Sequence, residues 1–511
     1  MAGYNPIQDF ESSLDRTDDD AIADDIPLRG RKLGESHNVC AEENGNNSDT
    51  AHDVENEKPP PRIVPKWKRY MTYSSRIKSS CIEALPRFCQ PGGLQIRGKL
   101  HPTSYLDALR GYAAFIVYVC HMVTFNVGQP PWRHQPFTSI LFAGPGMVAV
   151  FYVISGYVLS YSLLRNIRRQ ESAPTLEGLA SSTFRRYLRL YGSTVLAIFI
   201  TLIMIRLGWY GYDLYKPAII DQIKDWLLDV IFFCNPFADI RGYYYKGVHD
   251  TKYLGTMWTI PVEFRGSIIV FSFCTAVCKL STRSRMILTW MIILLGYLWN
   301  ALYVSQFLYG VFLADLSFGR HPERLMRPGD LPNTRVLPVQ GQRKIQLIHA
   351  KVCYSLLFVL AIFILGQPDQ IDLGIWGQFP WGFLKSFIPW YYSSESGQYW
   401  YLSMGAFILV LSLESYPILH RPLEWGVSQY IGDLSFGIYA LHPPLLFGFY
   451  RTWEEPMRKR YLGNSVLAYL PGLLAMTFLV LASADYFDRL DKKVVRLGKW
   501  LQGRTFRKWK N

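Results

Sequence analysis

The sequence predicts an all-α protein: a polytopic integral membrane helical bundle of about ten transmembrane helices, preceded by a disordered N-terminal tail. Half of the 511 residues are hydrophobic and 15% are aromatic, yet the mean hydropathy is only just positive. The average combines two kinds of sequence. Residues 1–60 are polar and acidic, which is typical of a disordered segment. After residue 100, apolar runs alternate with basic loops, as in a membrane domain.

Ten apolar runs are candidates for membrane spans. They are 105–127, 138–163, 190–207, 256–278, 286–303, 304–317, 351–366, 399–415, 429–450 and 466–484. A spanning helix needs about 20 residues, so several runs are short and 304–317 is the weakest. Pro443 and Pro444 lie inside 429–450 and predict a kink or a break there.

Basic residues beside these runs predict that both termini are cytosolic. Arginines and lysines gather before the first run, in the loops 164–189 and 318–350, and in the C-terminal tail. Ten spans would place all of these on one side, as the positive-inside rule requires. Two opposite loops are poor in basic residues, 128–137 with only Arg133 and 367–398 with only Lys385, whereas 451–465 carries four that would face outward. We therefore expect a multi-pass protein of the endoplasmic reticulum or the plasma membrane.

Three regions follow from this reading. They are a disordered cytosolic tail with a basic juxtamembrane segment (1–100), a transmembrane domain (101–485) and a basic cytosolic tail (486–511). The long loop 208–255 is rich in tyrosine and tryptophan and falls on the exoplasmic side, where an acceptor substrate can be bound. Its segment "KDWLLDVIFF" predicts an interfacial helix.

Composition also argues against two other kinds of site. The net charge of +14 comes from residues beside apolar runs rather than from one basic patch with interleaved aromatics, so we expect no nucleic-acid binding. The eight cysteines show no metal-ligand spacing, so we expect no metal.

Two ionisable residues share one face of the first predicted span. Arg110 and His121 are eleven residues apart, which in an α-helix is three turns plus about 20° and a rise of about 16 Å. Asp107, three positions before Arg110, lies on the same face. A charge in mid-bilayer costs about 3 kcal/mol on insertion scales, so such residues indicate function. The simpler alternatives are that Arg110 snorkels to the headgroups and that His121 is a neutral packing residue.

The segment "YLDALRGYAAFIVYVCH" resembles the opening signature of the membrane-bound acyltransferase 3 family, which is an arginine or lysine, ten residues and a histidine. "GPGMVAVFYVISGYVLS" (144–160) resembles that family's second helix, with Ser155 in its Ser-Gly-aromatic pattern. "FRRYLRLY" (184–191) resembles its basic loop, although Tyr191 replaces the usual proline.

Three further segments extend the resemblance to about 105–485. "MWTIPVEFRGSIIVF" (257–271) resembles the family's Trp-Ser-Leu-x-x-Glu block through Trp258 and Glu263. Gly266 and Ser267 stand where the family usually has an aromatic pair, so we expect the packing around Glu263 to differ from the family's. "FLYGVFLADL" and "IGDLSFGIYALHPPLL" resemble later helices, the second with Tyr439 and His442.

The resemblance implies an integral membrane O-acyltransferase that moves an acyl group from a thioester, usually acetyl-CoA, to a hydroxyl of a glycan, lipid or small metabolite. A hydroxyl attacks a thioester poorly unless a base removes its proton, and the imidazole pKa near 6.5 suits that task. We expect His121 to be this base. Planar guanidinium pairs well with phosphate, so Arg110 is expected to bind the CoA phosphates, helped by Arg186 and Arg189.

The remaining candidates have less defined roles. Glu263 is expected to bind the acceptor hydroxyl or to orient His121, or else to pair with Arg265 or pack helices. Asp107 is expected to offset the charge of Arg110 or to orient it. Ser155, Trp258 and Tyr439 are expected to be packing residues, and His442 to be structural or to line the substrate tunnel.

Two other functions remain open at this point. A transporter could use Arg110, His121 and Glu263 as a proton or ion relay, although no internal repeat is visible. A lipid-sensing scaffold or an inactive relative of the enzyme could keep the helices without turnover. The acceptor, the acyl chain length and the oligomeric state are not fixed by the sequence.

Overall fold

The computed structural model describes residues 82–96, 98, 100–126, 135, 137–210, 212–236, 251–326, 343–368 and 379–506. Within these residues the chain is helical and contains no strand, which confirms the predicted all-α class. The chain divides into a small unit, Leu14–Gly93, and a large unit that includes Leu94–Asn511. The described part of the small unit holds the 3-10 helix η2 (Arg87–Cys89). Most of the predicted disordered tail lies outside the described residues.

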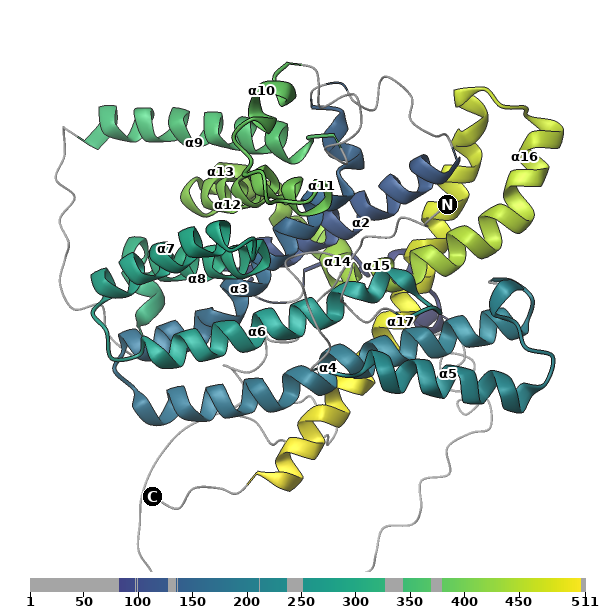
Figure 1. The fold of residues 1–511 in the computed structure, drawn as a ribbon, viewed down its shortest axis with the longest axis horizontal. Helices are drawn as coiled ribbons and strands as arrows, with labels where there is room; N and C mark the ends of the chain where they lie inside the picture. The colour runs from purple at the N-terminus through teal and green to yellow at the C-terminus, as the bar shows by residue number, and fades with distance from the viewer. Residues whose placement is uncertain are drawn as a thin grey trace, which may run out of the picture. The chain divides into compact units, whose positions relative to one another are not determined.

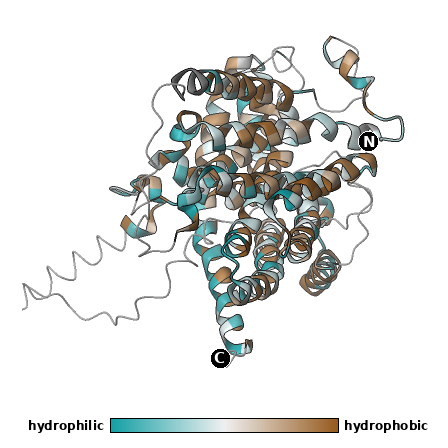
Figure 2. Cartoon of the chain, turned by 90° about the vertical axis from the view of Figure 1, so that its left-hand side faces the viewer, coloured by the Kyte–Doolittle hydropathy of each residue, from teal (hydrophilic) through white to brown (hydrophobic). Residues whose placement is uncertain are grey.

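Six helices of the described chain are long and apolar enough to cross a membrane. They are α2 (Ser104–Asn126), α3 (Gly144–Arg168), α4 (Ser172–Arg206), α6 (Thr259–Ala276), α8 (Leu302–Arg320) and α17 (Leu470–Thr505). A bent pair, α12 (Tyr399–Ser415) with Pro417–Glu424, makes seven if it is counted as one span. Figure 2 shows apolar residues along most of the helices, and polar residues towards the C-terminal end of α17.

The predicted count of ten spans is therefore not confirmed. Helices occupy all ten predicted ranges, but several are shorter than a bilayer requires. α7 (Thr282–Leu298) has 17 residues, and the apolar part of α9 (Arg343–Leu365) is only His349–Leu365. The remaining short helices are η4 (Ser139–Phe142), η5 (Tyr212–Leu214), η6 (Gly255–Trp258), η7 (Pro322–Leu325), α10 (Trp381–Lys385), α11 (Ser394–Gly397), α13 (Pro417–His420), η9 (Arg421–Glu424) and η11 (Val466–Tyr469).

The range 429–450 is built from several pieces. α14 (Gly426–Asp433) is followed by α15 (Ser435–Leu445), the π-helix η10 (Leu446–Glu454) and α16 (Glu455–Tyr461). Pro443 and Pro444 lie inside α15 and cannot donate a backbone hydrogen bond. The predicted disturbance near the prolines takes the form of a change from α to π geometry directly after them. π-helical segments are rare and are often found at functional sites.

The prediction of a basic loop at 164–189 is wrong, because α3 continues to Arg168 and α4 begins at Ser172. Pro174 does not interrupt α4, since it lies in the first turn, whose N–H groups have no partner within the helix. The boundary predicted at residue 485 falls inside α17, where carboxylate–cation pairs four residues apart continue the helix, such as Asp485 with Arg489 at 2.9 Å.

The segment after α4 contains the helix predicted there, α5 (Ile219–Phe233). α5 lies beside α4 (Figure 1) and runs antiparallel to it, since Trp226 contacts Phe199 and Phe233 contacts Tyr191. The opposite face of α5 exposes a row of large apolar side chains that includes Ile220, Leu228 and Phe232. Residues 237–250 of the predicted aromatic loop lie outside the described chain.

α3 and α8 form the tightest helix pair of the large unit, and they lie side by side in Figure 1. A Cβ atom at Gly156 would lie 1.9 Å from the backbone oxygen of Phe307, and one at Gly310 would lie 2.1 Å from that of Val153. Small residues permit such close approach of two backbones. Most of α3 is buried, and α3 also packs against α2, which carries Arg110 and His121.

Candidate active site

Two histidines meet near the end of α2. The rings of His121 on α2 and His442 on α15 are 5.3 Å apart between centroids and meet edge to face at 76°. Both side chains are buried, at 5% and 0% exposure. The aromatic rings of Tyr118 and Tyr439 flank His442 at 6.4 and 6.0 Å. α15 packs along α2, so residues more than 300 positions apart in sequence share one site.

The hydrogen bonding of His442 defines its tautomer. Its Nδ1 lies 3.1 Å from the backbone oxygen of Ile438. A carbonyl oxygen only accepts, so Nδ1 carries the proton and the Nε2 of the neutral ring is left as an acceptor. That Nε2 is buried and has no hydrogen-bond partner among the described residues.

Arg110 is enclosed by protein. Its side chain is 2% exposed, and Nη1 lies 3.8 Å from the Oδ1 of Asp107 one turn earlier. α14 covers this part of α2 closely, because a Cβ at Gly111 would lie 2.4 Å from the carbonyl group of Ile431. A snorkelling Arg110 would extend towards the lipid headgroups, so its burial argues against that alternative. Asp107 lies near enough to offset the charge of Arg110, and its role stays a prediction.

Arg186 and Glu263 form a second charged pair. Nη2 of Arg186 donates to the Oε1 of Glu263 at 2.5 Å, and its Nε donates to the Oγ of Ser267 at 2.7 Å. The alternative prediction, that Glu263 pairs with Arg265, is wrong, because Arg265 instead donates from Nε to the backbone oxygen of Pro236. The sequence placed Arg186 beside the donor phosphates, whereas the structure places it against this carboxylate.

The other sequence candidates, apart from Tyr439, lie on other elements than the histidine pair. Arg189 lies on α4, which packs against α17. Ser155 and Trp258 are buried. The hydroxyl of Tyr439 donates to the backbone oxygen of Thr256 in η6, which fixes α15 against the segment that leads into α6. Packing roles for Ser155, Trp258 and Tyr439 stay a prediction.

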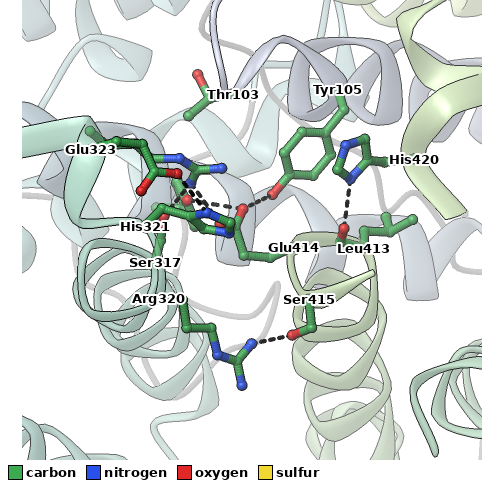
Figure 3. A network of polar contacts seen from close by, with 12 residues as sticks. Thr103, Tyr105, Ser317, Arg320, His321, Glu323, Leu413, Glu414, Ser415 and His420 are labelled. Atoms are coloured by element: carbon green, nitrogen blue, oxygen red, sulfur yellow. Dashed lines mark hydrogen bonds and ion pairs between the residues drawn. The ribbon is translucent and has the colours of Figure 1, made fainter. Parts of the chain in front are cut away.

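Sequence reasoning missed two buried carboxylates, Glu414 and Asp315. Glu414 accepts hydrogen bonds from Tyr105 at 2.5 Å and from Arg324 at 2.6 Å (Figure 3). Asp315 accepts from Arg168 at 2.7 Å and from Arg285 at 2.7 and 2.9 Å. An acidic residue in the last turns of an apolar run was the available signal, because such a residue needs a cation.

A cavity of ≈ 250 Å³ adjoins the Asp315 cluster. Its lining includes Arg168, Ser281, Thr282 and Arg285, and none of the sequence-predicted site residues. It is therefore separate from the His121–His442 pair. Across the described residues, no group of three or more histidine, cysteine, aspartate or glutamate side chains is placed to hold a metal ion.

Comparison with known proteins assigns the class. Residues 103–485 match the family described as acyltransferase domain. The chain therefore belongs to this family, and the family predicted from the sequence is confirmed. It is a multi-pass membrane acyltransferase.

Individual relatives agree with the class. The chain is 27% identical over 504 residues to the O-acetyltransferase PaAT-1 of Phomopsis amygdali, which covers 91% of this chain and 97% of that protein. It is 19% identical over 403 residues to the acyltransferase R4 of a Phoma species, with 68% and 83% covered. It is 28% identical over 172 residues to an O-acetyl transferase of Shigella phage Sf6, with 33% and 45% covered. No solved structure matches the chain.

Proposed function

We propose that this acyltransferase moves an acyl group, in the first instance acetyl, from acyl-CoA to a hydroxyl group, with His121 as the general base. The relationship to PaAT-1 extends over nearly the whole of both chains, and that relative is an O-acetyltransferase. The observation that carries the proposal is the buried imidazole of His121 on the face of α2 that also bears Arg110. Membership of an acyltransferase family argues against the transporter alternative.

The proposed reaction balances as a simple acyl transfer. The hydroxyl oxygen attacks the thioester carbonyl carbon while a nitrogen of His121 accepts the hydroxyl proton. The C–S bond then breaks, the CoA thiolate leaves, and the proton returns from the imidazolium to the sulfur. Burial suits the first step, because a low dielectric favours the neutral imidazole that accepts a proton.

Arg110 is proposed to bind a phosphate of the donor. A guanidinium can donate two parallel hydrogen bonds to a phosphate, and the rise of about 16 Å from Arg110 to His121 would separate the phosphate from the reacting thioester. Because the side chain is 2% exposed, this binding requires α14 to move away from α2. We also propose that both termini face the cytosol, so that donor from the cytosol reaches Arg110 first.

The proposal is tested with purified protein in lipid nanodiscs, acetyl-CoA labelled in the acetyl group and an extract of the host membranes as acceptor. His121→Gln should lower the transfer rate by about 10²- to 10⁴-fold, the usual contribution of a general base. His321→Gln is the matched control, since His321 lies outside the site beside Glu323 and its side chain is 34% exposed. A His121→Gln protein that transfers label at the normal rate contradicts the base assignment. Wild-type protein that moves no label out of acetyl-CoA contradicts the reaction itself.

A further inference from the structure

We infer that His442 is a positioning residue for His121: its Nε2 accepts the N–H of one His121 nitrogen and thereby fixes the tautomer in which the other nitrogen carries the lone pair of the base. This inference rests on the proposed acyl transfer. The structure joins the two rings at 5.3 Å in an edge-to-face contact, on two different helices. Neither ring reaches solvent to any extent.

The backbone bond of His442 sets the direction of its hydrogen bond to His121. Donation from Nδ1 to the Ile438 carbonyl holds the proton of neutral His442 on that nitrogen. The Nε2 of His442 is then an acceptor only. Because His121 faces this acceptor, the favoured His121 tautomer is the one that points its N–H at His442. In catalytic triads a carboxylate sets the tautomer of the histidine in the same way.

The buried Nε2 of His442 needs a hydrogen-bond partner. A buried polar atom without a hydrogen bond costs about 1–3 kcal/mol, and such exceptions need an explanation. The nearby tyrosine hydroxyls are engaged elsewhere: Tyr118 bonds to Thr477 at 3.2 Å, and Tyr439 donates to the Thr256 carbonyl. Among the ring contacts that the structure describes for His442, His121 is the remaining polar group. We therefore assign Nε2 of His442 to the His121 ring, whose centroid lies 5.3 Å from that of His442.

The contact between His121 and His442 changes in strength during the reaction. When His121 takes the hydroxyl proton it becomes an imidazolium, and its hydrogen bond to His442 becomes charge-assisted and therefore stronger. The interaction thus stabilises the transition state more than the ground state, which raises kcat rather than donor affinity. The proton itself stays on His121 until it passes to the leaving sulfur.

Two substitutions separate this role from a structural one. Glutamine places an amide at the position of Nε2 and can accept from His121, whereas asparagine places its amide at the position of Nδ1 and can only replace the bond to Ile438. We expect His442→Gln to keep most of the kcat. We expect His442→Asn to lower kcat by about 10²-fold, the usual effect of misorienting a reacting group, with the KM for acetyl-CoA changed by less than about twofold because the loss falls on the transition state.

The outcomes are distinct. A His442→Asn protein with normal kcat, or a His442→Gln protein no more active than His442→Asn, overturns the inference. The double variant with His121→Gln guards against a general folding defect: an effect through His121 predicts no further loss of the residual rate, while an equal further loss shows independent action and also overturns it. Failure of the proposed base is recognised separately, because His121→Gln alone would then be active.

Discussion

Arg186 on α4 and Glu263 on α6 form an ion pair that is almost wholly buried, with Nη2 and Oε1 2.5 Å apart and side chains 1% and 0% exposed. Each side chain thereby neutralises the other in a low-dielectric interior. The pair joins two of the long helices, and Ser267 extends it by accepting from Arg186 and donating to the Glu263 carbonyl. Sequence reasoning had assigned the two residues to different tasks.

Separating this pair should destabilise the protein strongly. Arg186→Met or Glu263→Gln alone leaves a buried group without its partner, which costs about 3–5 kcal/mol in comparable pairs. The double variant should be less destabilised than the sum of the two, because neither charge is then stranded. Thermal unfolding in detergent measures this. The exposed pair Lys459–Glu455 is the control, and Lys459→Met should change stability by less than about 1 kcal/mol. Additive losses would contradict the coupling.

Arg110 should act on the nucleotide end of the donor. Arg110→Met should raise the KM for acetyl-CoA by about 10-fold or more, since a hydrogen bond to a charged group contributes about 1.5–3 kcal/mol. With acetyl-pantetheine, which lacks the nucleotide, the same variant should change KM little. Steady-state kinetics with the two donors check this, and Arg496→Met on the exposed part of α17 serves as the control. An equal change with both donors counts against phosphate binding at Arg110.

The crossing of α3 and α8 should not tolerate a single added methyl group. Gly156→Ala and Gly310→Ala place Cβ atoms within 1.9 and 2.1 Å of backbone oxygens, so the helices must separate. Such overpacking typically costs about 1–3 kcal/mol. Gly503→Ala is the matched control, because a Cβ there meets nothing within 4 Å, and alanine favours a helix by about 1 kcal/mol over glycine. The melting temperature should fall for the first two variants and stay or rise for the third.

Glu414 should hold the segment after α8 in place (Figure 3). Burial alone would lower the pKa of Arg324, but the charge of Glu414 outweighs it and raises that pKa. Glu414→Gln removes this attraction, so hydrogen exchange should rise over η7, which carries Arg324. Tyr105→Phe, which removes a neutral donor to the same carboxylate, should have a smaller effect there. Unchanged exchange in η7 in Glu414→Gln would show that other contacts hold it.

The contact between α5 and residues 251–253 should weaken in acid. Burial opposes ionisation of Asp225, yet hydrogen bonds from Lys252 and Tyr253 outweigh it and lower the pKa of Asp225 below its usual 3.8. A carboxyl whose folded pKa is depressed stabilises the fold above its unfolded pKa, and this stabilisation is lost as the pH falls through the folded value. Cysteine labelling at position 252 or 253 is unsuitable, because it removes the contact.

Leu254 is fully buried next to this contact, so labelling of a cysteine introduced there reports its opening. Labelling should be slow at pH 6 when Asp225 is present and faster at that pH in Asp225→Asn, because asparagine is uncharged like the carboxyl that acid protonates. Asp221→Asn, on the same helix, is the control. Equal labelling in all three proteins contradicts a role for Asp225 in holding this segment.

Much of the site was readable before the fold was known. Arg110, His121 and Asp107 share a helix face because eleven and three residues are near whole numbers of turns, a property of local geometry. The all-α class followed from apolar runs that only helices can place in a membrane. The basic segment 164–189 was predicted as a loop, although α3 and the first half of α4 occupy most of it, because hydropathy marks where a helix is apolar and not where it ends.

The sequence by itself determined the helical class, the family and the stripe on α2, since each depends on neighbours along the chain. Only the tertiary structure decided that His442 meets His121, that Glu263 takes Arg186 rather than Arg265, and that Glu414 and Asp315 gather arginines from other helices. A buried charge or imidazole needs a partner, but several partners satisfy that need equally well in sequence. Helix packing chooses among them, because it alone sets which side chains from distant segments come within about 3 Å of each other.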